Sequence, residues 1–91
     1  MTTKKATEDM VNDLFDLILS LETREDCLLL FDDLCTYKEI ERMALRVRAA
    51  KLLIEGKTYS QVIDEVEISS ATLSRISRCV QYGSGYAKLL K

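Results

Sequence analysis

Hydrophobic residues recur along most of the chain with the three-to-four-residue spacing of amphipathic helices, and no stretch alternates with the two-residue period of a strand. The chain has no Pro and only three Gly, so few residues interrupt these patterns. We therefore predict an all-α fold of about six helices, over residues 7–20, 24–34, 36–55, 58–66, 70–82 and 86–91.

Helix boundaries are marked by residues that cap helix ends. Thr23 and Ser69 are of the N-cap type, because a short hydroxyl can accept a hydrogen bond from a free backbone N–H. The segments Thr36–Glu39 and Thr58–Gln61 have the capping-box form T-x-x-E/Q. Gly56 is placed to end the long middle helix at its C′ position.

The predicted organisation is a single domain, residues 1–91. We expect residues 1–6 to be flexible and residues 7–35 to form dimer-core helices. Residues 36–82 would form the long helix and a helix-turn-helix, and residues 83–91 a short C-terminal helix. The main apolar stripe of the long helix consists of Ile40, Met43, Ala44, Val47 and Ile54.

The helix predicted over 70–82 has an unusual polar face. Leu73, Ile76 and Val80 recur at helical spacing and should face inward. The short or basic side chains that remain outside or at the edge are Ser70, Thr72, Ser74, Arg75 and Ser77. From Ser69 to Gln81 the only charges are Arg75 and Arg78.

A face of this kind suits the major groove of DNA. Hydroxyl side chains can bond phosphates or base edges, and the N-terminus of a helix favours an anion. The residues predicted to contact DNA are Ser69, Ser70, Ala71, Thr72, Ser74, Arg75 and Arg78. The alternative is an ordinary surface helix that lacks acids.

Charge is distributed unevenly along the chain. The formal net charge is −2, which by itself argues against a nucleic-acid partner. However, residues 1–35 hold nine acidic and three basic residues (−6), and residues 36–91 hold six acidic and ten basic residues (+4). Because the local field steers association, the C-terminal half can bind DNA while the acidic half faces away.

The second predicted helix contains five consecutive apolar residues, Cys27–Phe31, which point around its whole circumference. A 91-residue monomer has little interior in which to bury them, whereas a homodimer with a shared core would bury them. The alternative is a central core helix in a monomer.

The chain resembles the bacterial tryptophan repressor superfamily, and within it the TrpR-like YerC/YecD family, over residues 10–82. The resemblance implies an all-helical, TrpR-like intertwined homodimer. The matching residues are Asp33-Leu34-Cys35-Thr36, Glu39, Leu45-Arg46-Val47-Arg48, Leu52-Leu53, Gly56 and Ala71-Thr72-Leu73-Ser74-Arg75.

The resemblance also implies an effector pocket. In the tryptophan repressor one arginine on each of two helices holds the corepressor, and these positions match Arg46 and Arg75. The family's small glycine is replaced by Ile76 and its serine by Cys79, so we expect the chain not to bind tryptophan. The alternative for Arg46, which the sequence favours, is an ion pair along its own helix with Glu39 or the neighbours of Arg42.

The helix-turn-helix departs from the common pattern at two positions, Asp64 in place of Ala and Glu67 in place of Gly. Gly is favoured in the turn because that residue often has positive φ. Either Glu67 adopts this conformation at some cost, or the turn has another geometry.

An enzyme is not expected. The chain has no His, no C-x-x-C spacing and no Gly-rich phosphate loop, and we predict no metal and no cofactor. Cys27, Cys35 and Cys79 lie among apolar residues and are predicted to be core thiols. No segment has the about 18 apolar residues of a membrane span, and no leader is apparent, so we expect a cytoplasmic protein.

The function that these patterns predict is sequence-specific binding of double-stranded DNA by a homodimeric transcriptional repressor. The alternative is a dimeric protein–protein interaction module on the same fold.

Overall fold

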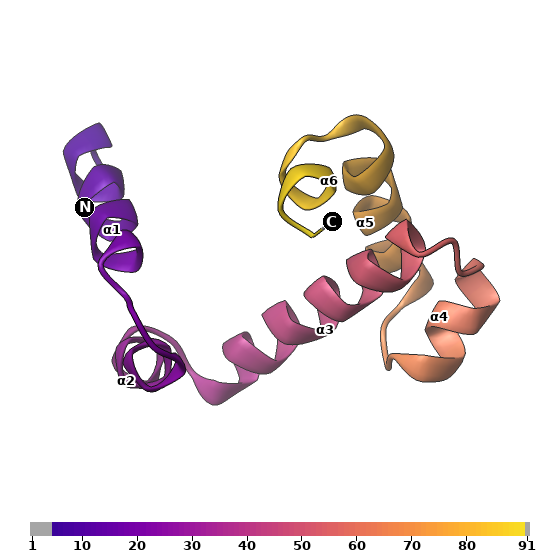
Figure 1. Cartoon of the computed structure of the whole chain (residues 1–91), viewed down its shortest axis with the longest axis horizontal. Helices are drawn as coiled ribbons and strands as arrows, with labels where there is room; N and C mark the ends of the chain where they lie inside the picture. The colour runs from indigo at the N-terminus through magenta and orange to yellow at the C-terminus, as the bar shows by residue number, and fades with distance from the viewer. Residues whose placement is uncertain (1–4, 91) are drawn as a thin grey trace. The chain divides into compact units, whose positions relative to one another are not determined.

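The computed structural model describes residues 5–90, and this part of the chain is helical without strands. The all-α prediction is therefore confirmed. Of the segment predicted to be flexible, residues 1–6, the first four lie outside the described residues. The helices are α1 (Glu8–Leu19), α2 (Arg24–Leu34), α3 (Tyr37–Ile54), α4 (Tyr59–Glu65), α5 (Ser70–Tyr82) and α6 (Gly85–Leu89) (Figure 1).

The predicted caps set these boundaries. The Thr23 side chain accepts a hydrogen bond from the backbone N–H of Asp26 (3.0 Å), which satisfies a donor at the start of α2. Thr58 and Gln61 form a reciprocal capping box at the start of α4, with hydrogen bonds of 3.2 and 2.9 Å.

Gly56 ends α3 as predicted. Its φ of 94° lies in the left-handed region that glycine tolerates. The N–H of Gly56 donates to the carbonyl of Leu53, and that of Lys57 donates to the carbonyl of Leu52, both at 3.0 Å. This pair of bonds is the Schellman arrangement, which satisfies carbonyls at the end of the helix.

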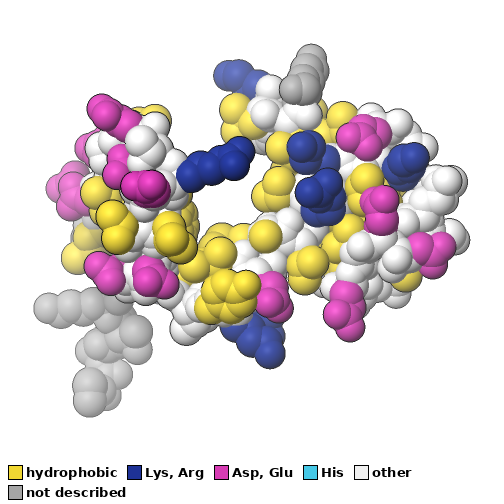
Figure 2. Space-filling view, turned by 60° about the horizontal axis from the view of Figure 1, so that its bottom comes forward, with side chains coloured by type: hydrophobic (Ala, Val, Ile, Leu, Met, Phe, Trp, Pro, Cys, Tyr) yellow, Lys and Arg dark blue, Asp and Glu magenta, His cyan; other side chains and the backbone are white. Residues whose placement is uncertain are grey.

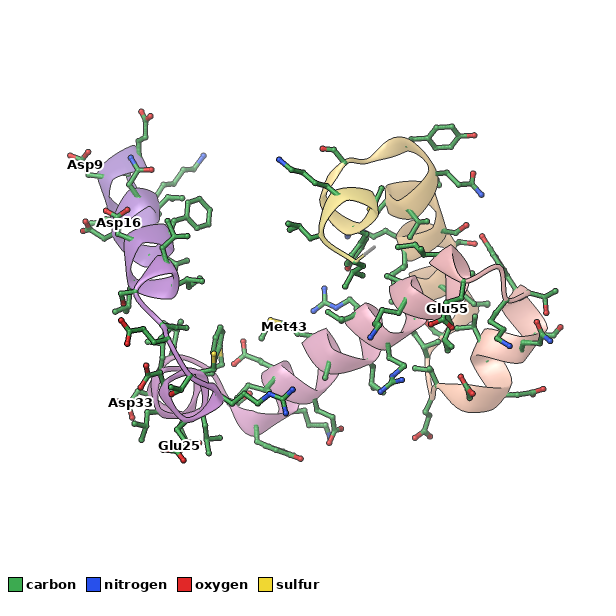
Figure 3. The ribbon with its side chains drawn as sticks, in the orientation of Figure 1. Asp9, Asp16, Glu25, Asp33, Met43 and Glu55 are labelled. Atoms are coloured by element: carbon green, nitrogen blue, oxygen red, sulfur yellow. The ribbon has the colours of Figure 1, made fainter. Side chains whose placement is uncertain are left out.

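The chain divides into two compact units, residues 1–36 and residues 37–91. In the first unit neither α1 nor α2 contributes a buried residue. Large apolar side chains are exposed on both helices, and Figure 2 shows them among acidic groups at the surface of this unit, on the left. Asp9 and Asp16 project from one side of α1 (Figure 3). The packing of α1 and α2 within this unit therefore leaves apolar surface uncovered.

The second unit contains the core. Helix α3 packs against α4, α5 and α6, which gather around its C-terminal part (Figure 1). The buried apolar residues of this core are Ala49, Ala50, Leu52, Val62, Val66, Leu73 and Ile76. Small alanines on α3 allow the close approach of neighbouring helices, which fixes the position of α5.

The apolar stripe predicted for α3 is not the face that packs in this core. Met43 and Val47 are 36% and 42% exposed, and Ala44 is also exposed. Met43 projects from the first half of the helix (Figure 3). Helix α3 has two apolar faces, and the core of the unit uses the one that carries Ala49, Ala50 and Leu52.

The turn between α4 and α5 has a geometry that does not require positive φ at Glu67. No residue other than glycine has positive φ in the described part of the chain. Glu67 therefore sits in the turn without left-handed strain, and the absence of Gly there needs no compensation. No helix among the described residues is long and apolar enough to cross a membrane.

Candidate nucleic-acid interface

Helix α5 presents the predicted polar face to solvent. Ser69, Ser70, Ala71 and Ser74 are exposed, and Thr72 is partly buried. The Ser69 side chain caps the helix by accepting a hydrogen bond from the backbone N–H of Thr72 (3.2 Å). The exposed N-terminal turn of α5 is thus fixed by its own cap.

The two arginines of α5 are also exposed. Arg75 and Arg78 are three residues apart, so they lie on neighbouring parts of the helix surface about one turn apart. Helix α5 contains no acid in its first turn or elsewhere. Its outer surface is therefore cationic, with hydroxyl groups toward its N-terminus.

The opposite face of α5 anchors it. Leu73 is fully buried, Ile76 is 3% exposed, and Val80 packs against the core, as predicted. The prediction that Ser77 lies outside or at the edge is wrong, because Ser77 is 5% exposed. A hydroxyl can be buried here because the side-chain amide of Gln81 donates to Ser77 Oγ over 3.5 Å.

A pocket of about 460 Å³ lies between α3 and α5. Arg46 of α3 and Arg75 of α5, the two residues assigned to an effector pocket by resemblance, both line it. Ile76 and Cys79, the two departures from the family, line it as well. Because Ile76 is also part of the core, its side chain is held in place at the pocket wall.

Three further residues of this pocket were not assigned to it from the sequence. Arg42 lies one helical turn before Arg46, so their spacing on α3 was a usable signal. Glu67 reaches the pocket from the turn, and Tyr86 reaches it from α6. The contribution of Tyr86 depends on how α6 folds back, which no local pattern encodes.

Arg46 makes a hydrogen bond along its own helix. Its Nε donates to the backbone carbonyl of Arg42 over 3.4 Å. The ion pair with Glu39 stays a prediction. Arg46 is exposed, which leaves its guanidinium accessible from the pocket and from solvent.

The cysteines are not core residues of the single chain. Cys27 and Cys79 are exposed, and Cys35 is partly buried. Beside Cys27 the apolar neighbours Leu28 and Leu29 are themselves exposed, whereas Cys79 is exposed although its neighbour Val80 packs against the core. Among the described residues, no group of three or more Cys, Asp or Glu side chains could hold a metal ion.

A second, apolar groove of about 490 Å³ lies beside the first pocket. It is formed by α3, α5, α6 and the loop between α5 and α6. Cys79 and Tyr86 line both cavities, and the other residues around the groove are Val47, Gly83, Gly85, Leu89 and Leu90.

Comparison with known proteins agrees with this architecture. The family model of the Trp repressor protein matches residues 9–91. The Bacillus subtilis (strain 168) protein YerC, which is uncharacterised, is 46% identical over 74 residues, covering 81% of this chain and 71% of YerC.

Two solved structures are similar in fold. A candidate Trp repressor from Staphylococcus aureus superposes with a TM-score of 0.87 at 41% identity, over 92% of this chain and 85% of that one. A TrpR-like protein from Eubacterium eligens ATCC 27750 gives 0.83 at 36% identity, over 90% and 84%. The chain therefore belongs to the Trp repressor family, a family of helix-turn-helix regulators.

Proposed function

We propose that this protein is a sequence-specific DNA-binding transcriptional repressor that acts as a homodimer in the cytoplasm. The observation that carries the proposal is the outer surface of α5, which is exposed, free of acids and fixed by a buried inner face. A helix of this kind can enter the major groove without repelling phosphate.

The proposed contacts follow the order of residues along α5. Ser69 and Ser70 lie at the N-terminus, where free N–H groups favour a phosphate. Ala71, Thr72 and Ser74 are short enough for close approach to base edges. Arg75 and Arg78 would contact phosphates along the same surface.

Dimerisation is proposed because the single chain leaves apolar helices uncovered. Leu28 and Leu29 of α2 are 65% and 68% exposed, and Phe15 of α1 is 53% exposed. Exposed apolar area of this extent is typical of an interface. A second copy would cover it and place two α5 helices on one operator.

Tryptophan is not the proposed effector. The branched side chain of Ile76 is packed in the core and lines the pocket, so it cannot move aside for a flat indole ring. Cys79 offers a thiol where the family has a hydroxyl, and a thiol is a weaker hydrogen-bonding group.

Retention of DNA tests the proposal. Immobilised protein is incubated with sheared genomic DNA of the source organism, and the retained fragments are sequenced. The proposal predicts enrichment of a limited set of fragments with a shared, two-fold symmetric sequence. A protein–protein interaction module on the same fold would enrich no sequence and would pass through heparin at low salt.

A further inference from the structure

The pocket between α3 and α5 holds three arginines and a single acid. Arg42 and Arg46 come from α3 and Arg75 comes from α5, while Glu67 is the one carboxylate among the lining residues. Arg42 and Arg46 are four residues apart, a spacing at which like charges on a helix repel. A cavity lined by three arginines and one acid carries excess positive charge, which an anion would stabilise.

The same pocket includes the start of α5. Ser69, the N-cap, and Thr72, in the first turn, line it together with the arginines. Arg42, Arg46 and Arg75 are all exposed, so an anion can approach from solvent without displacing the core. Guanidinium groups bind phosphate with paired N–H donors, which adds direction to the attraction.

We propose that this pocket binds a backbone phosphate of DNA, and that Arg42 extends the DNA-binding surface from α5 onto α3. The inference rests on the proposed function, because the phosphate arrives with DNA lying along α5. Arg42 acts as a phosphate-binding residue and carries no sequence information. A phosphate placed here would also fix the register of Thr72 on the bases.

The position of the pocket favours duplex DNA over a free anion as its ligand. The pocket opens beside the exposed N-terminal turn of α5, where the proposed base-reading residues Ser70 and Ala71 lie. A phosphate held there is continuous with the strand that α5 would read. Binding of a free anion would not require the site to lie beside the helix proposed to read DNA.

The test compares the salt dependence of DNA binding in matched variants. Arg42→Gln should lower the slope of log affinity against log salt by about one unit per protomer. Arg48→Gln is the control, because Arg48 is an exposed arginine of α3 outside the pocket. Arg42→Lys keeps the charge and should restore the slope, with affinity still reduced because the paired donors are lost.

Three results would overturn the inference. Equal slopes for Arg42→Gln and Arg48→Gln, with normal DNA binding by wild type, would refute the pocket while leaving the proposed function intact. Absence of DNA binding by wild type would refute both the phosphate-binding pocket and the proposed function. If millimolar inorganic phosphate raises the melting temperature of DNA-free protein, relative to chloride at equal ionic strength, and Arg42→Gln abolishes that rise but leaves the salt slope of DNA binding at the wild-type value, the site serves a free anion instead.

Discussion

Ser69 and Thr72 are linked by two hydrogen bonds at the start of α5. Thr72 donates its backbone N–H to Ser69 Oγ at 3.2 Å, and Ser69 Oγ–H donates to Thr72 Oγ1 at 2.9 Å. The cap therefore orients the hydroxyl of the residue proposed to read a base. Because Thr72 Oγ1 accepts this bond, its own proton remains available for another acceptor.

Removing the cap should reduce both stability and DNA recognition. Ser69→Ala loses the bond to the Thr72 N–H and should cost about 1 kcal/mol of unfolding free energy. Urea denaturation followed by circular dichroism measures this change. Ser70→Ala changes the next residue, which is the first of α5 and not its N-cap, so this control should stay within about 0.5 kcal/mol of wild type. Equal losses for the two variants would show that the cap contributes little.

The loop between α5 and α6 should tolerate a methyl group at one glycine and not at the other. A Cβ at Gly83 would lie 2.6 Å from the carbonyl oxygen of Cys79, whereas a Cβ at Gly85 meets nothing within 4 Å. Gly83→Ala should therefore lower the melting temperature by several degrees, since backbone must shift, at a cost of about 1–3 kcal/mol. Gly85→Ala should match wild type, and a comparable loss in both variants would contradict this geometry.

The dimer can be tested at a residue that has no structural role in a monomer. Leu29 is 68% exposed, so in a monomer Leu29→Asp should be harmless. If a second copy covers α2, the aspartate is buried there and the folded state should be lost, because an unpaired buried charge is costly. Sedimentation equilibrium and circular dichroism at micromolar concentration report both properties.

The matched control for the dimer is Ile63→Asp, which changes an exposed apolar residue of α4 in the second unit. We expect this variant to remain folded and to sediment like wild type. A well-folded 10.4 kDa monomer for the wild-type protein would contradict the dimer directly.

Local chemistry predicted the helix boundaries because caps act through bonds between neighbours in sequence. Thr58, Ser69 and Gly56 each have the role that the sequence indicated. The periodicity of α3 was less informative, since it carries two apolar faces and periodicity does not tell which one packs within the chain. In the predicted stripe Met43 and Val47 are exposed and Ile54 is only partly buried, while Ala49 on the other face is fully buried.

In the candidate DNA-binding site, too, local sequence predicts some features and not others. The exposed residues of α5 could be predicted from its pattern of charges and apolar positions. The burial of Ser77 could not, because a serine at the edge of an apolar stripe is compatible with either environment. The spacing of Arg42 and Arg46 along α3 was a usable signal, but Arg75 joins them only when α3 and α5 pack together, and that contact is not encoded by local spacing.

Binding of free tryptophan offers a test of the pocket wall. Titration calorimetry with L-tryptophan should give no heat above dilution at millimolar ligand, because Ile76 occupies the wall where the indole would enter. DNA binding should likewise be the same with and without tryptophan. A saturable isotherm, or a gel shift that requires tryptophan, would show that the side chain of Ile76 leaves room for the ring.

Reading of a base by Thr72 should be separable from binding of phosphate. Thr72→Ala removes a hydroxyl and a methyl, so it should change sequence preference at a cost of about 1–3 kcal/mol on the preferred site. The salt dependence should remain nearly unchanged because no charge is lost. Selection from a randomised duplex library, compared between wild type and variant, measures the preference, and an unchanged preference would remove Thr72 from the base-reading residues.

The most direct test of DNA binding by α5 is a salt-titrated fluorescence anisotropy series on wild type, Arg78→Ala and the double variant Lys4→Ala, Lys5→Ala. Wild type should bind duplex DNA with an affinity that falls as salt rises, and Arg78→Ala should reduce that slope by about one unit per protomer. The lysine pair lies in the acidic N-terminal part of the sequence and should leave the slope unchanged. If the lysine pair lowers the slope more than Arg78→Ala does, an N-terminal arm holds the DNA and α5 is not the recognition helix.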